Sequence, residues 1–598
     1  MIKFILELFS LLTPRQRKSF YFLQILVLVM AFMEILGVAS IIPFMALVGD
    51  ISQLQQDTLA AKVYEASGLS SELQFVFLMG VGVLVMLILA TIVSMYTTWK
   101  ISMFATRVGA EISSKLFNHY IKQDWLFHVN SSSAQLTKKV AVEASRVAIG
   151  VVMPLMHMNA RFVMALFMGL TIFIYDPIVA IIGLTIFAIS YLVLFKLVRS
   201  KLHRNGVAIS NVNEQRFRLM NESFGGIKDV LLLGRDFDFI NRFDKTSDVL
   251  AYSQGINSTL TQVPRYFMEL VTFGSMITLV LYLIVNHNGD LGVILPILSV
   301  YALAGFKLLP SFQLIYTSLA RIKSNSPGFT SIRKDLIDSY DTDDTRGEIE
   351  KTQLHPKQQL EFQNVTFTYP GNKKSALFEV NISIQVNEVV GIVGPSGSGK
   401  STLIDILLGL INPTQGSLVV DNEIINDTNR RSWQNSIGFV AQDIFLSEGT
   451  IAENIAFGVP KDAIDLERVE QTLELAHLTE LIQSYKNGID TKVGERGIKL
   501  SGGQCQRIGI ARALYHKAEV LIFDEATSSL DGITEKMIMD SINNFSGQKT
   551  IIMIAHRLKT VQKCDNIFFL EEGKVTDSGN FKQLLESNEN FRNMAEHA

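Results

Sequence analysis

The stretch Gly394-Pro-Ser-Gly-Ser-Gly-Lys-Ser401 decides the fold of the second half of this chain. A β-branched apolar run precedes it at 389–393 and a helical pattern follows at 402–410, which gives the order strand, glycine loop, helix. In this order the glycines let backbone N–H groups approach phosphates, and the helix N-terminus adds positive partial charge. The sequence predicts a site for ATP, with Lys400 reaching the β- and γ-phosphates and Ser401 binding Mg²⁺. The predicted phosphate-binding residues are Gly394, Ser396, Gly397, Ser398, Gly399, Lys400, Ser401 and Thr402.

A second apolar run, 520–523, ends in Asp524-Glu525. An acidic residue at the carboxyl end of a parallel strand lies at the edge of the sheet where ligands bind. We therefore expect Asp524 to be the carboxylate on the Mg²⁺ side, and Glu525 to polarise the water that attacks ATP.

A phosphate-facing loop of a different kind is predicted at Leu500-Ser-Gly-Gly-Gln504. With this motif the chain resembles an ATP-binding-cassette exporter (type IV fold) over its whole length. The resemblance implies that the loop binds the ATP held by an opposite protomer, through Ser501, Gly502, Gly503 and Gln504. Cys505 departs from the family pattern, which usually has Lys or Arg before Gln506-Arg507.

Four further positions take their predicted roles from the resemblance alone. Tyr369 matches the aromatic residue that stacks on adenine, and Gln442 matches the glutamine that touches Mg²⁺. Asp531 matches a loop that crosses the dimer interface, and His556 matches the switch histidine beside the γ-phosphate. Glu525, His556 and Gln442 thus form the predicted catalytic set, and Ser401, Gln442 and Asp524 the predicted metal set.

The first half of the chain is built to cross a membrane. Of the 598 residues, 48% are hydrophobic, and the mean hydropathy is +0.26. A bilayer core of about 30 Å needs roughly 20 helical residues. Six apolar stretches meet this length, at about 20–48, 73–98, 147–175, 177–196, 258–286 and 291–319. We expect a helical transmembrane domain at 1–325, a linker at 326–358 and an α/β P-loop domain at 359–598.

The charges of the connecting segments predict the orientation. Residues 100–146 carry seven Lys and Arg, whereas 49–72 carry only Lys62. This alternation places both termini and the nucleotide-binding domain in the cytosol, and a bacterial inner membrane is implied by the resemblance to bacterial flippases. Residues 2–12 predict a short amphipathic helix on the cytosolic face. The net charge of −3 argues against a nucleic-acid partner, and the two cysteines show no metal-binding spacing.

Charged residues in the spans are the candidate substrate contacts, because each must face protein, water or ligand. Arg265 and Lys307 are candidates to line a cavity for an anionic head group, although Arg265 has Glu269 four residues on and the two could simply pair. Glu34 is expected to bond to a neighbouring helix, with a role in substrate binding as the alternative.

Several membrane segments resemble bacterial flippases for lipid-linked oligosaccharides: 32–44, 264–269 and 306–311. The resemblance implies ATP-driven flipping of a lipid-linked oligosaccharide or related anionic glycolipid. The alternative is a multidrug or lipid exporter on the same scaffold. Six spans and one nucleotide domain make half a transporter, so a homodimer in the lipid bilayer is expected.

Overall fold

The computed structural model describes residues 2–49, 51, 54, 59–69, 71–175, 177–286, 291–341, 352–525, 532, 535, 536, 539, 545–555 and 557–596. The chain divides into two compact units. The first consists of Met1–Gln123 and Phe127–Asp344, and the second of Asp124–Leu126 and Thr345–Ala598. Each unit is described by itself.

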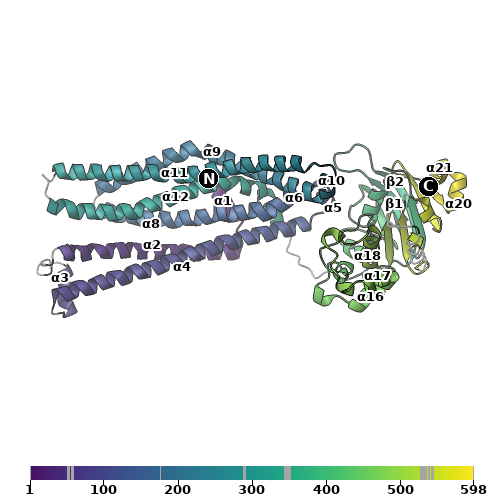
Figure 1. Ribbon diagram of the computed structural model, residues 1–598, viewed down its shortest axis with the longest axis horizontal. Helices are drawn as coiled ribbons and strands as arrows, with labels where there is room; N and C mark the ends of the chain where they lie inside the picture. Colours follow the sequence, from purple (N-terminus) through teal and green to yellow (C-terminus); the bar gives the residue numbers. More distant parts are fainter. Residues whose placement is uncertain are drawn as a thin grey trace. The chain divides into compact units, whose positions relative to one another are not determined.

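Long helices build the first unit and run side by side in Figure 1. They are α2 (Pro14–Gly49), α4 (Glu72–Ile121), α8 (Met153–Tyr175), α9 (Pro177–Gly225), α11 (Asp236–Asn286) and α12 (Leu291–Asp341). At 1.5 Å per residue, α4, α9, α11 and α12 are each roughly 75 Å long, more than twice the thickness of a bilayer core. Five of the predicted spans lie wholly in this set of helices, and the sixth, 147–175, begins just before α8. The helices α4, α9, α11 and α12 continue well beyond their predicted spans.

Among the described residues, four helical stretches are long and apolar enough to cross a membrane. They are Pro14–Met45, Glu72–Ile121, Ser133–Ile174 and Ala180–Gly225. The predicted spans 258–286 and 291–319 fall in α11 and α12, where parts of the chain lie outside the described residues.

The helix that leads into α8 contains two π-helical segments. It begins with α6 (Ser133–Thr137) and α7 (Ala144–Val147), and the π segments are Lys138–Glu143 and Ala148–Val152. π-Helical turns are rare and occur often at functional sites. Glu143 in the first segment is fully buried, so this region carries a charge inside the helical unit.

The predicted linker 326–358 is wrong over its first half, because α12 continues to Asp341. Phe329, Ile332 and Leu336 follow one another at helical spacing and are at most 1% exposed. The polar residues between them hid this apolar stripe in the sequence. The following strand begins at Gln359, where the α/β domain was predicted to begin.

Short helices complete the first unit: α1 (Ile2–Ser10), α3 (Leu59–Ser67), α5 (Trp125–Asn130, whose first two residues belong to the second unit) and α10 (Ile227–Leu232). The predicted N-terminal helix is therefore present. Leu8 and Leu12 are buried in a core shared with α2, α4 and α12. These two side chains are covered by protein, and the position of the helix on the cytosolic face stays a prediction.

The second unit contains two sheets. The four-stranded sheet has the order β2-β1-β4-β5 and the six-stranded sheet the order β10-β9-β3-β8-β7-β6. Their strands are β1 (Gln359–Phe367), β2 (Leu377–Gln385), β3 (Val389–Val393), β4 (Gln415–Val420), β5 (Glu423–Ile424), β6 (Ile437–Val440), β7 (Val520–Asp524), β8 (Thr550–Ile554), β9 (Asn566–Glu571) and β10 (Lys574–Gly579). Strands β9, β3, β8, β7 and β6 are parallel neighbours.

The larger sheet is buried on both faces. On β3, Val389 and Val393 belong to one hydrophobic core, and Val390 and Ile392 belong to the other, as the period of two along a strand requires. The α-helices that the structure describes in this unit are α13 (Lys400–Leu407), α14 (Arg430–Gln434), α15 (Ile451–Ile455), α16 (Leu466–Leu475), α17 (Thr479–Ser484), α18 (Gly502–Tyr515), α20 (Phe581–Ser587) and α21 (Glu589–Glu596).

Candidate functional site

The phosphate loop connects the carboxyl end of β3 to the first turn of α13, as the sequence predicts. A Cβ atom at Gly394 would lie 2.1 Å from the carbonyl oxygen of Leu570, and one at Gly399 would lie 2.7 Å from that of Ala376. Gly399 also has a φ of 104°, which glycine adopts without strain. Neighbouring backbone therefore requires glycine at both ends of the loop.

Lys400 is folded over this loop and is 6% exposed. Its Nζ donates to the carbonyl oxygens of Gly394 at 2.7 Å and Pro395 at 3.0 Å. Burial lowers the pKa of Lys400, against the opposing effect of the charges on Glu525 and Asp524. The Ser398 hydroxyl is buried and has no hydrogen-bond partner among the described residues. A buried ammonium and a free hydroxyl beside a helix N-terminus fit an anionic ligand.

The first turn of α13 carries Ser401 and Thr402. The Tyr369 hydroxyl lies 3.1 Å from Oγ1 of Thr402, and its ring packs edge-on against Phe367. The structure thus brings Tyr369 to the phosphate loop, whereas its stacking on adenine stays a prediction. Ser396 in the same loop is exposed.

Asp524, the last residue of β7, and Glu525 directly after it lie at the same edge of the sheet as the phosphate loop, because only β8 separates β7 from β3. Gln442, two residues after β6, donates from Nε2 to Oε2 of Glu525 at 2.8 Å. Glu525 has a φ of 49°, and its backbone N–H donates to the Ile554 carbonyl oxygen at 3.0 Å. The predicted group of Lys400, Gln442, Asp524 and Glu525 is therefore assembled. Asp531 and His556 lie outside the described residues.

The second predicted phosphate-binding loop, Leu500–Gln504, which we call the signature loop, begins a different helix, α18. Ser501 is its N-cap and accepts a hydrogen bond from the backbone N–H of Gln504, whose side chain accepts one from the backbone N–H of Ser501. Ser501 and Gly502 are exposed, and Gly503 is partly exposed. Within the described part of the chain, the side-chain hydrogen bonds of Ser501 and Gln504 join them to each other, which leaves this helix N-terminus open to a ligand.

The three predicted substrate residues have different outcomes. Glu34 accepts from Ser94 on α4 at 2.9 Å and lies 3.9 Å from Nη1 of Arg161 on α8, which confirms its bond to a neighbouring helix. Arg265 pairs with Glu269 at 2.7 Å on an exposed face of α11. The side chain of Lys307 lies outside the described residues.

A polar cavity of about 590 Å³ lies inside the helical unit, between α8, α11 and α12. Two arginines line it, and its other lining residues are uncharged. The lining residues are Arg161, Asn257, Ser258, Thr261, Gln262, Pro310, Gln313, Leu314, Thr317, Arg321, Ser324 and Asn325. We call this space the polar cavity. Arg265 is not one of its lining residues.

Sequence reasoning missed Arg321 and Asn257 because they lie outside the predicted spans. A usable signal was present on α12: the lining positions 310, 313, 314, 317, 321, 324 and 325 recur with helical periodicity. This stripe continues past the predicted end of the span at 319.

Two family models match the chain. The model of the ABC transporter transmembrane region matches residues 20–306, and the ABC transporter model matches residues 377–528. Together with the ATP site and the long helices described above, they define the class. The chain is a half-transporter of the ABC exporter family, with a transmembrane domain and an ATPase domain coupled to transport.

Two named relatives and one solved structure are similar to most of this chain. The ATP-dependent lipid A-core flippase of Ralstonia nicotianae is 29% identical over 82% of each chain. That of Shewanella frigidimarina is 27% identical over 87% of this chain and 85% of its own. A structure of a bacterial Atm1-family ABC exporter with ATP bound matches with a TM-score of 0.79, covering 97% of this chain and 98% of that one. At 20% identity, this last match shows the fold alone.

Proposed function

We propose that this protein uses ATP hydrolysis to flip an anionic glycolipid, of the lipid-linked oligosaccharide or lipid A-core type, across a bacterial inner membrane. The polar cavity carries the proposal. Arg161 and Arg321 offer it two positive charges, and hydroxyl and amide groups suited to sugar line the rest. Arginine binds phosphate in a bidentate manner, and both side chains are accessible to a ligand, because Arg161 is partly exposed and Arg321 is exposed. The names of the relatives support the same class of substrate.

The charge available to a ligand depends on Glu34. Its Oε1 is 3.9 Å from Arg161 Nη1, beyond hydrogen-bond distance, so Arg161 keeps capacity for a second anion. The Glu34 carboxylate is held by the hydroxyl of Ser94 instead. A negatively charged head group would thus compete with a weak internal partner and not with a tight one.

The ATP site supplies the driving force. Lys400 and the loop amides are proposed to hold the phosphates, and Glu525, with Gln442 and His556, to position and activate the attacking water. Ser401, Asp524 and Gln442 offer oxygen donors of the kind that Mg²⁺ prefers, so these residues fit that ion. When bound there, Mg²⁺ would neutralise charge on the phosphate oxygens.

The open signature helix supports a homodimer. The Ser501 end of α18 is exposed in one chain, and a second copy can bring it to ATP held by the first. Two ATP sites would then form between two chains, with ATP favouring the closed pair and hydrolysis releasing it. The Lys and Arg of segments such as 100–146 support a cytosolic position for both termini.

Flipping in proteoliposomes tests the proposal. A fluorescent polyprenyl-diphosphate oligosaccharide and a fluorescent lipid A-core are assayed separately, with ATP and with a Glu525→Gln control. Arg161→Gln and Arg321→Gln are each expected to reduce flipping by about tenfold while basal ATPase persists. Arg265→Gln, outside the cavity, is the matched control and is expected to keep both activities.

An apolar amphiphile is the alternative substrate. A second cavity of about 520 Å³ between α2 and α4 is walled mainly by apolar side chains, including Leu87, Met95 and Trp99. Robust ATPase without movement of either glycolipid, combined with export of a lipophilic dye, would favour the multidrug or lipid exporter. Equal flipping by wild type and by both cavity variants would also contradict the proposed role of the arginines.

A further inference from the structure

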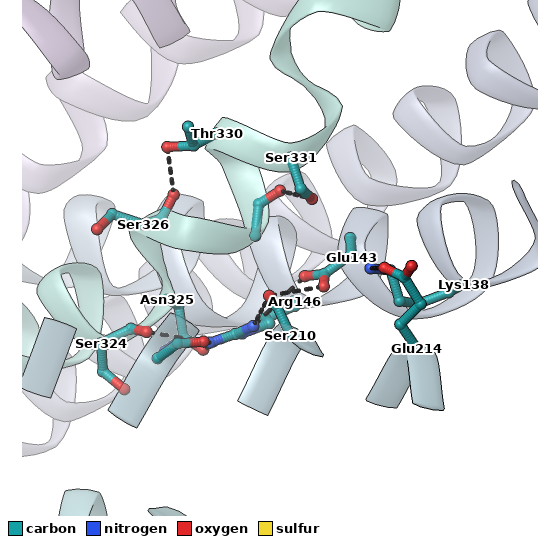
Figure 2. A network of polar contacts seen from close by, with 12 residues as sticks. Lys138, Glu143, Arg146, Ser210, Glu214, Ser324, Asn325, Ser326, Thr330 and Ser331 are labelled. Carbon is teal, nitrogen blue, oxygen red and sulfur yellow. Dashed lines mark hydrogen bonds and ion pairs between the residues drawn. The ribbon is translucent and has the colours of Figure 1, made fainter. Parts of the chain in front are cut away.

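The side chain of Arg146 on α7 is buried in the helical unit, at 9% exposure, and all its hydrogen-bond donors are used (Figure 2). A guanidinium group has five N–H donors. The five acceptors are Asn325 Oδ1 at 2.9 Å from Nε, Ser210 Oγ at 2.7 Å and Glu143 Oε2 at 3.4 Å from Nη1, and the carbonyl oxygens of Gly206 and Ser324, each 3.0 Å from Nη2. One arginine therefore joins three helical segments.

We call Arg146 and these five partners the clamp. Gly206 and Ser210 lie on α9, and Ser324 and Asn325 lie on α12. Glu143 comes from the first π-helical segment, is fully buried and also accepts from Ser210 at 2.8 Å. The charges cancel inside the unit, but removal of either one would leave the other buried and unpaired.

The helices of the clamp touch without clearance. A Cβ atom at Gly206 would lie 2.0 Å from the Ser324 carbonyl oxygen, and one at Gly328 would lie 2.6 Å from Glu143 Oε2. A small slide of α9 along α12 would therefore leave buried donors unpaired or drive backbone into backbone. Packed contacts of this kind have discrete arrangements and do not deform continuously. The clamp is either closed or fully broken.

The clamp also forms part of the polar cavity. Ser324 and Asn325 line that cavity and bind Arg146 at the same time. Asn257, another lining residue, donates to the Ser324 hydroxyl at 2.6 Å and accepts from Asn205 of α9 at 3.0 Å. A change at the clamp must therefore change the cavity wall.

A second contact joins the same segments farther along. Lys138 in the first π-helical segment pairs with Glu214 on α9 at 2.7 Å and is 4% exposed (Figure 2). Lys138 lies about one turn from Glu143, and Glu214 lies about one turn from Ser210. The Lys138–Glu214 ion pair is therefore expected to break when the π-helical segment and α9 move apart.

We infer that Arg146 is a positioning residue for transport: it holds α9 to α12 and to the π-helical segment at the cavity, and every transport cycle opens and re-forms this clamp. A cavity that loads on one side and unloads on the other must change which helices are in contact around it. The contacts of Arg146 are the all-or-none element on which that change acts. The inference rests on the proposed function of the polar cavity.

A reversible bridge tests whether the clamp opens. Lys138→Cys and Glu214→Cys are combined with Cys505→Ser and joined by a short bis-methanethiosulfonate; Cys564 is buried. The bridge is expected to lower both ATPase and lipid A-core flipping by about tenfold, and dithiothreitol is expected to restore them. The two cysteines unbridged control for loss of the ion pair. Full turnover of the bridged protein would overturn the inference.

Weakened clamps test the role of Arg146 itself. Glu143→Gln with Arg146→Gln removes both charges together, and Ser210→Ala is the milder change if that pair fails to fold. Each is expected to keep basal ATPase within about threefold but to reduce lipid A-core moved per ATP by about tenfold, because one lost partner shifts a buried contact by about that factor. Arg218→Gln on the same helix removes an exposed ion pair to Glu214 and serves as the control.

A purely structural Arg146 gives another pattern. The Ser210→Ala protein would then lose thermal stability and ATPase in parallel, with an unchanged ratio of lipid moved to ATP hydrolysed, which overturns the inference. If wild type moves no lipid A-core, the proposed function fails for that probe. The bridge still reports on the clamp through ATPase alone, so the two failures are distinguishable.

Discussion

Glu525 combines a strained backbone conformation with a side chain that is hydrogen-bonded to Gln442. Its φ of 49° is uncommon for a residue with a side chain and costs about 1–3 kcal/mol. The Ile554 carbonyl oxygen holds its N–H, and Gln442 holds its carboxylate. Such strain persists where surrounding structure fixes a functional group, which supports Glu525 as the residue that activates water.

Glu525→Gln keeps the shape of the side chain and removes its basicity. We expect steady-state ATPase to fall by about 10²–10⁴, with equilibrium binding of labelled ATP retained. Glu519→Gln, whose side chain pairs with His355 elsewhere in the unit, is the control and should hydrolyse ATP normally. A Glu525→Gln protein with wild-type turnover would remove Glu525 from the mechanism.

The two cysteines differ in reactivity. Burial raises the pKa of Cys564 to about 12, and it also raises that of Cys505. The folded state therefore keeps the Cys564 proton at a pH where the unfolded thiol loses it. The resulting stabilisation is complete below about pH 9 and is lost as the pH rises towards 12.

A thiol reagent at pH 8 should modify Cys505 before Cys564. In a Cys505→Ser protein, modification of Cys564 should follow the unfolding curve, because the thiol is 6% exposed in the core of the ATPase domain. Mass spectrometry along a urea titration measures this. Rapid modification of Cys564 in folded protein would contradict its burial.

At the scale of elements, the helical unit depends on glycines where helices cross. Gly206 of α9 meets the Ser324 carbonyl oxygen of α12, whereas a Cβ at Gly255 of α11 would meet nothing within 4 Å. Replacement of glycine by alanine is therefore expected to have opposite effects on stability at Gly206 and at Gly255.

Gly206→Ala is expected to lower the thermal unfolding midpoint, because overpacking costs about 1–3 kcal/mol, and to reduce transport. Gly255→Ala should leave the midpoint unchanged or raise it, since alanine favours a helix by about 1 kcal/mol over glycine. Fluorescence-detected thermal unfolding in detergent compares them. Equal midpoints would mean that the close approach of α9 to α12 is absent in solution.

At the scale of the molecule, the proposed homodimer predicts ATP sites shared between two chains, with the phosphate loop before α13 contributed by one chain and the Leu500–Gln504 loop before α18 by the other. Lys400→Ala damages the first loop and Ser501→Ala the second. In a mixed dimer of these two chains, one site combines both defects and the other is intact.

Each variant alone is expected to be inactive, and co-expression should restore about a quarter of wild-type ATPase, since about half of random dimers are mixed and each has one intact site. Tandem purification on two tags isolates the mixed dimer. An inactive mixed dimer would contradict ATP sites built from two chains.

Local sequence predicted the ATP machinery. A strand, a glycine loop and a helix are contiguous, and Asp524-Glu525 directly follows a buried run, so strand order alone brings them to one edge. Hydropathy likewise predicted six spans, because a bilayer demands long apolar helices whatever their partners, and four of these predictions overlap the apolar helical stretches among the described residues. The roles of His556, Asp531 and Lys307 stay predictions.

Tertiary structure alone decided the contacts between helices. The clamp joins Arg146 to Asn325 across 179 positions, and the same packing places Arg161 and Arg321 at the polar cavity and Arg265 outside it. The burial of Phe329, Ile332 and Leu336 also stabilises the part of α12 that extends into the predicted linker. Periodicity in a sequence reports that a helix has a face, but the rotation and crossing of helices determine what that face meets.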